Sequence, residues 1–257
     1  MKKEILSLLI CLLLLIISFS GCVEESGPKD GDKRLISTEY TGGAYNASIL
    51  YEEVYEDGKW SNCTEIRYTK NGREYIDYFK PSMRDTLDWI KSNTNENAII
   101  LCWWDYGGMI IGYCERNAIA RFASLALKDT LHPFAAGWFD EEKKKKFIEE
   151  NEWASNETIK DIANVLTTTN FTSNETKQII EKYNASYILT DRYDFFIAKV
   201  FFAAIGKNPD EYIVNYMPTE KGNETLIFQM WSDDTQILGL QLYYTVADVR
   251  IFELVMS

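Results

Sequence analysis

The chain has 257 residues, of which 46% are hydrophobic and 14% aromatic. This is enough for one large globular domain and excludes disorder for most of the length. Its 27 Lys and Arg against 39 Asp and Glu give a net charge of −12, which excludes a nucleic-acid partner because such proteins carry basic surfaces. The single histidine, His132 before Pro133, excludes His-rich zinc sites and disfavours a Ser-His-Asp hydrolase.

Residues 1–22 are predicted to be a targeting segment, because two lysines precede an apolar run over residues 5–19. This run is shorter than the roughly 20 residues of a membrane-spanning helix and matches the apolar part of a signal peptide. The following Ser-Gly-Cys resembles a lipobox, so Cys22 is the predicted lipidation site; an uncleaved signal anchor is the alternative. Both place the protein at the cell membrane, anchored on the extracytoplasmic face, with a polar linker at 23–40 and a globular domain at 41–257.

Seven asparagines lie in N-x-S/T sequons, whereas chance placement gives about two. The excess favours an extracytoplasmic glycoprotein, although Asn, Ser and Thr also gather at helix N-caps and turns, which explains some of these sites equally well. The predicted glycosylation sites are Asn46, Asn62, Asn156, Asn170, Asn174, Asn184 and Asn223.

Three cysteines follow the targeting segment: Cys63, Cys102 and Cys114. An odd number permits at most one disulfide within the mature chain, and a bridge between Cys102 and Cys114 is one possibility. Free buried cysteines are the favoured interpretation, because cysteine packs as a small hydrophobic residue.

The first half of the domain reads as strands followed by a helix. Residues 40–80 predict a β-meander, with Asp-Gly and Asn-Gly turns centred on 57–58 and 71–72. A helix is predicted from Pro81 to Ser92, with Ser82 as its N-cap. Strands are predicted over 98–104 and 118–122. The mixed charges of 140–151 predict a helix with a solvated face.

The second half predicts helices over 156–165, 174–183 and 194–205, and a strand over 185–190. Residues 211–255 alternate as strands. The pattern predicts an α/β or α+β fold, a mixed single globular domain with a central strand and turn at Trp103–Gly107, flanking helices and β-strands at both ends.

The sequence WWDYG, from Trp103 to Gly107, follows the predicted buried strand. Adjacent residues on a strand point to opposite faces, so one tryptophan is expected in the core and the other at a surface pocket. An indole N–H, a carboxylate and a phenol there are suited to hold a Ser or Thr hydroxyl, and glycine allows close backbone approach. A packed turn without function is the alternative.

This WWDYG string resembles the signature of the oligosaccharyltransferase catalytic subunit, which moves a lipid-linked glycan onto the asparagine of N-x-S/T. Archaeal members are also similar to the segments DTLDWIKSNTNENAIILCWWDYG, IANVLTTTNFTSNETKQIIEKYNASYILTD and DVRIFELV. The resemblance covers roughly Asp85 to Val255. It implies a soluble C-terminal domain that recognises the Ser or Thr of the sequon.

The family's membrane region, which carries the metal-binding and asparagine-activating residues, has no counterpart in this sequence. The resemblance therefore implies no catalytic residue, metal site or cofactor here, and leans against an enzyme acting alone. The family's accessory Asp and Lys match Asp194 and Lys199 only poorly, because five residues on one helix place them about 140° apart. Asp191 is an alternative partner, and capping by Asp194 with a snorkelling Lys199 is as good an explanation.

A further departure is Arg121, where the family usually has an acidic residue nearby. The peptide-binding residues that the resemblance implies are Trp103, Trp104, Asp105, Tyr106, Gly107 and Lys199. The acidic clusters at 140–142 and 233–234 lack calcium-loop spacing and are read as solvated acids. The aromatic residues at 138, 139 and 153 are read as packing.

Three functions are compatible with these features. The first is a membrane-anchored module that binds N-x-S/T polypeptide segments without transferring glycan by itself. The second is an accessory or split subunit of protein N-glycosylation that acts with a separate membrane-embedded oligosaccharyltransferase. The third is a structural envelope lipoprotein that has kept the fold and lost binding.

Overall fold

The computed structural model describes residues 28–29, 31–56, 58–125, 152–232 and 236–255. Several predictions lie outside these residues: the targeting segment with Cys22, the helix over 140–151, His132, the two acidic clusters and the aromatic residues at 138 and 139. Within the described part, no helix is long and apolar enough to cross a membrane.

The predicted meander is an antiparallel four-stranded sheet in the order β1-β2-β3-β4. Gly58 and Gly72 have positive φ angles in the two predicted hairpin turns, as does Asn71, so the turn chemistry is confirmed. The sheet also begins earlier than predicted, since β1 starts inside the range assigned to the linker. Its strands are β1 (Lys33–Gly42), β2 (Ala47–Glu56), β3 (Lys59–Lys70) and β4 (Arg73–Tyr78).

The second sheet has five strands in the order β10-β11-β7-β5-β6. Strand β5 runs parallel to β6 and β7, whereas β11 runs antiparallel to β7 and β10. This mixed sheet and the separate meander make the fold α+β. Its strands are β5 (Ile99–Leu101), β6 (Asn117–Ala118), β7 (Tyr187–Asp191), β10 (Leu240–Val246) and β11 (Val249–Leu254).

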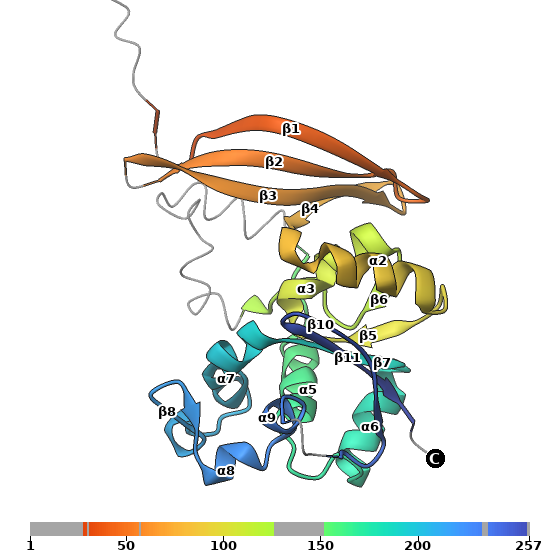
Figure 1. The fold of residues 1–257 in the computed structure, drawn as a ribbon, viewed down its shortest axis with the longest axis vertical. Helices are drawn as coiled ribbons and strands as arrows, with labels where there is room; N and C mark the ends of the chain where they lie inside the picture. Colours follow the sequence, from red (N-terminus) through yellow and green to blue (C-terminus); the bar gives the residue numbers. More distant parts are fainter. Residues whose placement is uncertain (1–27, 30, 57, 126–151, 233–235, 256–257) are drawn as a thin grey trace, which may run out of the picture.

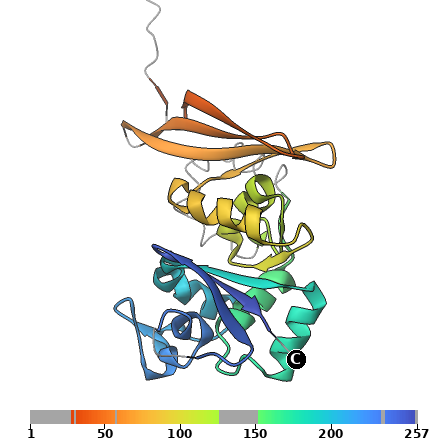
Figure 2. The same ribbon diagram turned by 45° about the vertical axis from the view of Figure 1, so that its right-hand side comes forward.

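Helices form two further layers (Figures 1 and 2). Helices α2 and α3 lie between the meander and the mixed sheet, and the later helices lie beyond the mixed sheet. The helical elements are η1 (Pro81–Met83), α2 (Arg84–Asn93), α3 (Trp104–Met109), η2 (Ile110–Cys114), α5 (Asn156–Leu166), α6 (Asn174–Tyr183), α7 (Arg192–Ala204), η5 (Pro209–Glu211), α8 (Glu220–Asn223) and α9 (Leu226–Gln229).

Three strand predictions are wrong in extent. The strand predicted over 98–104 ends at Leu101, because Trp104 already begins α3. The strand predicted over 118–122 is reduced to the two residues of β6. The alternating region 211–255 contains α8, α9 and a short hairpin of β8 (Ile213–Val214) and β9 (Met217–Pro218) before the terminal strands. Apolar alternation at this length does not separate strands from buried single-turn helices.

Serine N-caps begin two of the predicted helices. Ser155 accepts a hydrogen bond from the Thr158 amide at 3.0 Å, and Ser173 accepts one from the Thr176 amide at 3.2 Å. The N-cap predicted at Ser82 is wrong, because that residue lies inside η1 and α2 begins after Met83 without a side-chain cap. The alternative bridge between Cys102 and Cys114 does not form, since both thiols are buried without a disulfide.

Candidate functional site

The WWDYG residues form the first turn of α3 rather than a turn after a strand. Trp103 has extended backbone angles (φ −64°, ψ 147°) and is the N-cap residue of the helix. A Cβ atom on Gly107 would lie 1.9 Å from the Ala120 carbonyl oxygen. The absence of a side chain at Gly107 therefore lets the segment around Ala120 pack directly on this helix. The motif is thus fixed in place by the core around it.

Burial divides the motif residues into two groups. Trp103 is 1% exposed and Tyr106 is 2% exposed, and Gly107 is also buried. The Trp103 ring packs 4.4 Å from that of Phe201. Trp104 and Asp105 are only half-buried. One tryptophan in the core and one near the surface was predicted, but the start of a helix, not strand alternation, produces this division.

The two half-buried residues have hydrogen-bonding groups without partners. The indole Nε1 of Trp104 is buried and donates no hydrogen bond within the described structure. No hydrogen bond to the Asp105 carboxyl occurs among the described residues. An unsatisfied buried polar group costs about 1–3 kcal/mol. A free donor and a free acceptor on consecutive residues are what a hydroxyl group, which both donates and accepts, requires.

The Asp105 carboxyl is strongly perturbed. Desolvation raises its pKa to about 8, with a further rise from Asp194 and an opposing effect from Lys80. The buried Asp194 has its own pKa raised to about 7, mainly by desolvation, against hydrogen bonds that favour its ionised form. Strong perturbation in a partly accessible position is typical of functional sites.

This raised pKa predicts that Asp105 lowers stability at alkaline pH. The folded protein holds a proton on Asp105 that the unfolded chain releases near pH 4, so the stability of the fold decreases as pH rises from 4 to 8. We expect Asp105→Asn to raise the free energy of unfolding by about 1–2 kcal/mol at pH 8.5, or about 4 °C in Tm, with no gain at pH 4.

Thermal unfolding of both proteins at the two pH values measures this effect. Asp248→Asn, which changes an exposed carboxyl in the turn between β10 and β11, is the matched control and is expected to show no pH-dependent gain. A gain at pH 4 as large as that at pH 8.5 would contradict the assignment.

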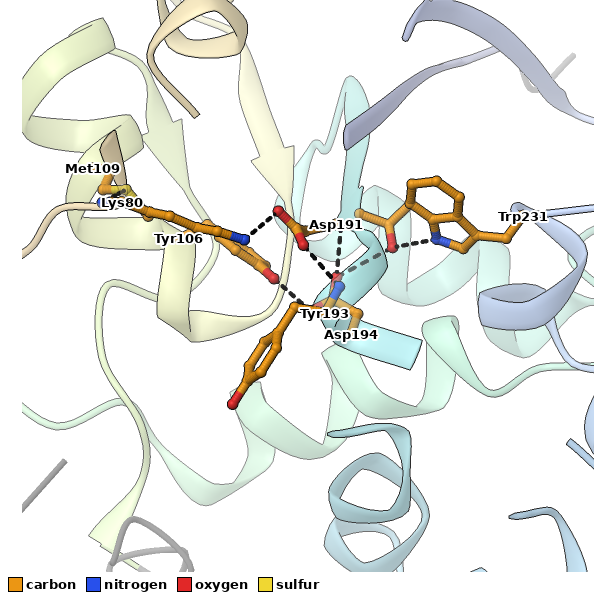
Figure 3. A network of polar contacts seen from close by, with 8 residues as sticks. Lys80, Tyr106, Met109, Asp191, Tyr193, Asp194 and Trp231 are labelled. Atoms are coloured by element: carbon orange, nitrogen blue, oxygen red, sulfur yellow. Dashed lines mark hydrogen bonds and ion pairs between the residues drawn. The ribbon is translucent and has the colours of Figure 1, made fainter. Parts of the chain in front are cut away.

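A buried network ties the motif helix to the start of α7 (Figure 3). The Tyr106 hydroxyl donates to Asp194 Oδ1 at 2.7 Å. Asp194 Oδ2 accepts from the Thr190 hydroxyl at 3.1 Å and from the Asp191 amide at 3.0 Å. The Trp231 indole donates to the Thr190 hydroxyl at 3.3 Å. Asp194 also completes the capping box of α7, which confirms its predicted capping role.

Asp191 connects a cation, Lys80, to this network. Its Oδ2 is 2.7 Å from Lys80 Nζ, and its Oδ1 accepts from the Tyr193 amide at 2.7 Å. The Asp191 side chain is 3% exposed and that of Lys80 is 27% exposed. Lys80 follows the last meander strand and points its ammonium group at Asp191 (Figure 3), and its positive charge favours the ionised form of the motif carboxyl of Asp105.

Lys199 lies elsewhere. Its Nζ is 2.6 Å from Asp210, and both side chains are largely exposed, at 44% and 74%. Asp194 is fully buried beneath the motif. The two residues therefore do not face one pocket, as their helical spacing predicts, and the cation beside Asp191 is Lys80.

Arg121 has a packing role in the structure. It donates to Asp77 Oδ1 at 2.6 Å, while the Tyr68 hydroxyl donates to Asp77 Oδ2 at 2.9 Å. Asp77 also packs against Gly108 of the motif helix. The Arg121–Asp77 ion pair thus joins the meander to the segment after β6, and Asp77 also joins it to α3 through Gly108. Arg121 also lines a separate cavity of about 340 Å³ with Tyr75 and Trp153, which no motif residue lines.

The sequence did not identify Lys80, Tyr78 and Tyr193, which interact electrostatically with the motif carboxyl. Desolvation is the largest cause of the raised pKa of both tyrosines, and the charge of Asp105 raises it further. No periodicity marks these positions. The only signal was their location at the ends of predicted elements, before Pro81 and at the start of α7. In the described part of the chain, no group of three or more His, Cys, Asp or Glu is arranged to hold a metal ion.

These features define a mixed α+β domain with a half-buried, unpaired carboxyl and indole at the start of a motif helix. No protein-family model matches the chain. Dolichyl-phosphooligosaccharide-protein glycotransferase 2 of Pyrococcus horikoshii is 51% identical over 35 residues, which make up 14% of this chain and 5% of that protein. The chain thus matches a small part of this curated relative's length.

Solved structures of oligosaccharyltransferase from Archaeoglobus fulgidus are also similar. One C-terminal globular domain matches 68% of this chain and 98% of its own, at 18% identity and a TM-score of 0.48. A second matches 70% of this chain and 98% of its own, at 16% identity and a TM-score of 0.41. An oligosaccharyltransferase bound to an inhibitory peptide and a dolichol-phosphate matches 61% of this chain and 22% of its own, at 15% identity and a TM-score of 0.37.

The resemblance to archaeal oligosaccharyltransferase that the WWDYG segment indicates is confirmed by the sequence match to the Pyrococcus protein. The chain spans only a small part of the Pyrococcus protein, so the activity of the complete enzyme is not carried over here.

Proposed function

We propose that this domain binds polypeptide segments that contain N-x-S/T and recognises the Ser or Thr hydroxyl. The observation that carries the proposal is the pair of unpartnered groups on Trp104 and Asp105. The hydroxyl donates its proton to the Asp105 carboxylate and accepts a hydrogen bond from the Trp104 indole N–H. Neither group has a competing partner among the described residues, so binding replaces no existing bond of the protein.

The arrangement also favours a small hydroxyl over other groups. A ligand carboxylate is repelled by Asp105 and by the nearby Asp194. A methyl group in the same place leaves both protein groups desolvated and unpaired, which costs about 1–3 kcal/mol. The site therefore discriminates by the presence of a hydroxyl rather than by the area it buries.

The proposed location is the extracytoplasmic face of the cell membrane, with residues 1–22 as signal peptide or anchor and Cys22 as the lipidation site. The seven sequon asparagines are exposed in the structure, which is compatible with the proposed glycosylation of this protein. Mass spectrometry of the protein from its native membrane tests both modifications: a diacylglycerol adduct on an N-terminal Cys22 peptide and glycan on asparagine are the expected products.

A binding titration of the full chain in detergent tests the proposed recognition. We expect a blocked Asn-Gly-Thr peptide to bind about tenfold tighter than the matched Asn-Gly-Ala peptide, because one charge-assisted hydrogen bond contributes about 1.5 kcal/mol or more. Trp104→Phe, which keeps a ring and removes the N–H, and Asp105→Ala are each expected to reduce this preference to less than about twofold. Asp248→Ala is the exposed control and is expected to retain it.

Equal affinity for the two peptides in the wild-type protein would contradict hydroxyl recognition. Retention of the preference in Asp105→Ala would contradict the role of this carboxyl. Circular dichroism of each variant establishes that the fold is intact before its affinity is interpreted.

A second candidate is an accessory subunit that works with a separate membrane-embedded glycosyltransferase. The observation that favours it is the match to a small part of a protein described as a glycotransferase. Mild-detergent purification of the chain from its native membrane tests this function: a polytopic glycosyltransferase is the expected companion, and a preparation without one would leave the peptide-binding module alone.

A further inference from the structure

Three large aromatic side chains on β4 and α7 are open to solvent. Tyr78 is 49% exposed, Tyr193 is 42% exposed and Phe196 is 54% exposed. Tyr193 and Phe196 are three residues apart on α7, so they share one face of that helix. Tyr78 ends β4, two residues before Lys80. The three rings therefore come from two separate elements, β4 and α7.

Several interactions relate Tyr193 and Tyr78 to the motif carboxyl of Asp105. Lys80 Nζ lies 5.9 Å from the centre of the Tyr193 ring and 2.7 Å from Asp191, which also holds the Tyr193 amide. Desolvation raises the pKa of Tyr193 and of Tyr78, and the charge of Asp105 raises both further. We define the exposed surface of Tyr78, Tyr193 and Phe196 as the aromatic edge.

Exposed tyrosine and phenylalanine grouped in this way are typical of binding surfaces, because each buries a large rigid area at a low cost in side-chain entropy. Tyr193 packs on Lys80 and Asp191, and the Asp105 charge acts on both tyrosines, so we infer that the aromatic edge borders the proposed hydroxyl site. Its occupant is therefore expected to be another part of the same bound peptide.

The geometry of an extended peptide determines which of its residues reaches the aromatic edge. Alternate side chains of an extended chain point the same way, about 7 Å apart along the chain. When the Thr hydroxyl points at Asp105, the side chains two positions before and two positions after it also face the domain. The position two before the Thr is the sequon asparagine itself, which leaves the position two after it for the aromatic edge.

We propose that the domain prefers sequon peptides with an aromatic residue two positions after the Ser or Thr, and that this residue packs on the aromatic edge. The inference rests on the proposed hydroxyl recognition and specifies the class of peptide that the same site takes. Lys80 adds to the preference, because its ammonium group lies beside Tyr193 and attracts the face of a bound aromatic ring.

Three blocked peptides test the inference with the full chain in detergent: Asn-Gly-Thr-Gly-Phe, Asn-Gly-Thr-Gly-Ala and Asn-Gly-Ala-Gly-Phe. We expect the first to bind roughly tenfold tighter than the second, as burial of one aromatic side chain on others implies. Tyr193→Ala and Phe196→Ala are each expected to reduce that ratio to about twofold while the preference for Thr over Ala remains.

Tyr216→Ala is the matched control, because Tyr216 is a 69% exposed tyrosine in the β8–β9 hairpin. It is expected to leave both preferences unchanged. Equal binding of the first two peptides, with a retained preference for Thr over Ala, would overturn the aromatic inference and leave hydroxyl recognition standing. Equal binding of the first and third peptides would overturn hydroxyl recognition, and the inference that rests on it.

Discussion

The affinity of the domain for an Asn-Gly-Thr peptide is expected to rise roughly a hundredfold between pH 6 and pH 9. The bound hydroxyl donates to the ionised form of Asp105, whose pKa in the free protein is raised to about 8 by desolvation and by Asp194. At pH 6 only about one molecule in a hundred has this carboxyl ionised, and apparent affinity is reduced by the same fraction. Above pH 8 the ionised form predominates and the affinity reaches a plateau.

The groups that face Asp105 determine the shape of this profile. Asp194 titrates nearby with a pKa of about 7, and its ionisation opposes that of Asp105. Lys80 favours ionisation of Asp105. The raised pKa values of Tyr78, Tyr193 and Cys102, to which Asp105 contributes, keep these groups neutral across most of the range. The increase in affinity is therefore assigned to the two carboxyls.

Isothermal titration calorimetry across this pH range measures the effect. Asp105→Asn lacks the carboxyl that accepts the hydroxyl proton and is expected to bind weakly, with only the smaller pH dependence that the remaining carboxyl of Asp194 contributes. An affinity that decreases as pH rises would contradict the account, because it would mean that a protonated Asp105 is the form that binds.

Lys80→Met is expected to lower the free energy of unfolding by about 2–3 kcal/mol. The substitution leaves the carboxylate of Asp191, whose side chain is 3% exposed, without its cation. Breaking a buried ion pair costs about 3–5 kcal/mol, and the partial exposure of Lys80 reduces this cost because water reaches the vacated position. The same substitution removes the positive charge that opposes the raised pKa of Asp105, so the rise in affinity is expected to move to higher pH.

Lys199→Met provides the matched control. It breaks the Lys199–Asp210 pair, whose side chains are 44% and 74% exposed, and exposed pairs contribute about 0–1 kcal/mol. Urea unfolding at pH 7 compares the two variants, and Lys80→Arg is expected to recover most of the loss. Equal stability of Lys80→Met and Lys199→Met would contradict the structural importance of the Lys80–Asp191 pair.

The elements that local chemistry specifies were predictable from the sequence. Asp-Gly and Asn-Gly turns determine the hairpins of the meander, since they supply the positive φ angles that such turns need. Ser155 and Ser173 mark the starts of α5 and α6 because their side chains satisfy free amide groups of the first turn. These signals depend on only a few neighbouring residues.

The start of α3 was not predictable in this way. The apolar run before the motif reads as one long strand, yet Trp104 begins a helix with no side-chain cap. Packing of Gly107 against Ala120 and of Gly108 against Asp77 stabilises this helix, and both partners are remote from the motif in sequence. Tertiary contacts, rather than local propensity, decide such short segments.

The residues of the candidate site also divide into those that local sequence identifies and those that only tertiary contacts bring in. WWDYG is a local string, so Trp104 and Asp105 were identifiable from the sequence. Lys80 and Tyr193 reach the site only through the pairing of Lys80 with Asp191, which are 111 positions apart. Spacing along α7 correctly separates Asp194 from Lys199, but no local pattern indicates that the meander supplies the cation instead.

In the proposed complex, one peptide hydroxyl bridges the Trp104 indole and the Asp105 carboxylate. The indole N–H resonance of Trp104 in the full chain, recorded with Asn-Gly-Thr and Asn-Gly-Ala peptides at pH 8.5, reports on this bridge. We expect a saturable downfield shift with the Thr peptide that is absent with the Ala peptide and lost in Asp105→Ala. An indole resonance that does not move while the Thr peptide binds, or that moves equally with both peptides, would contradict this bridge.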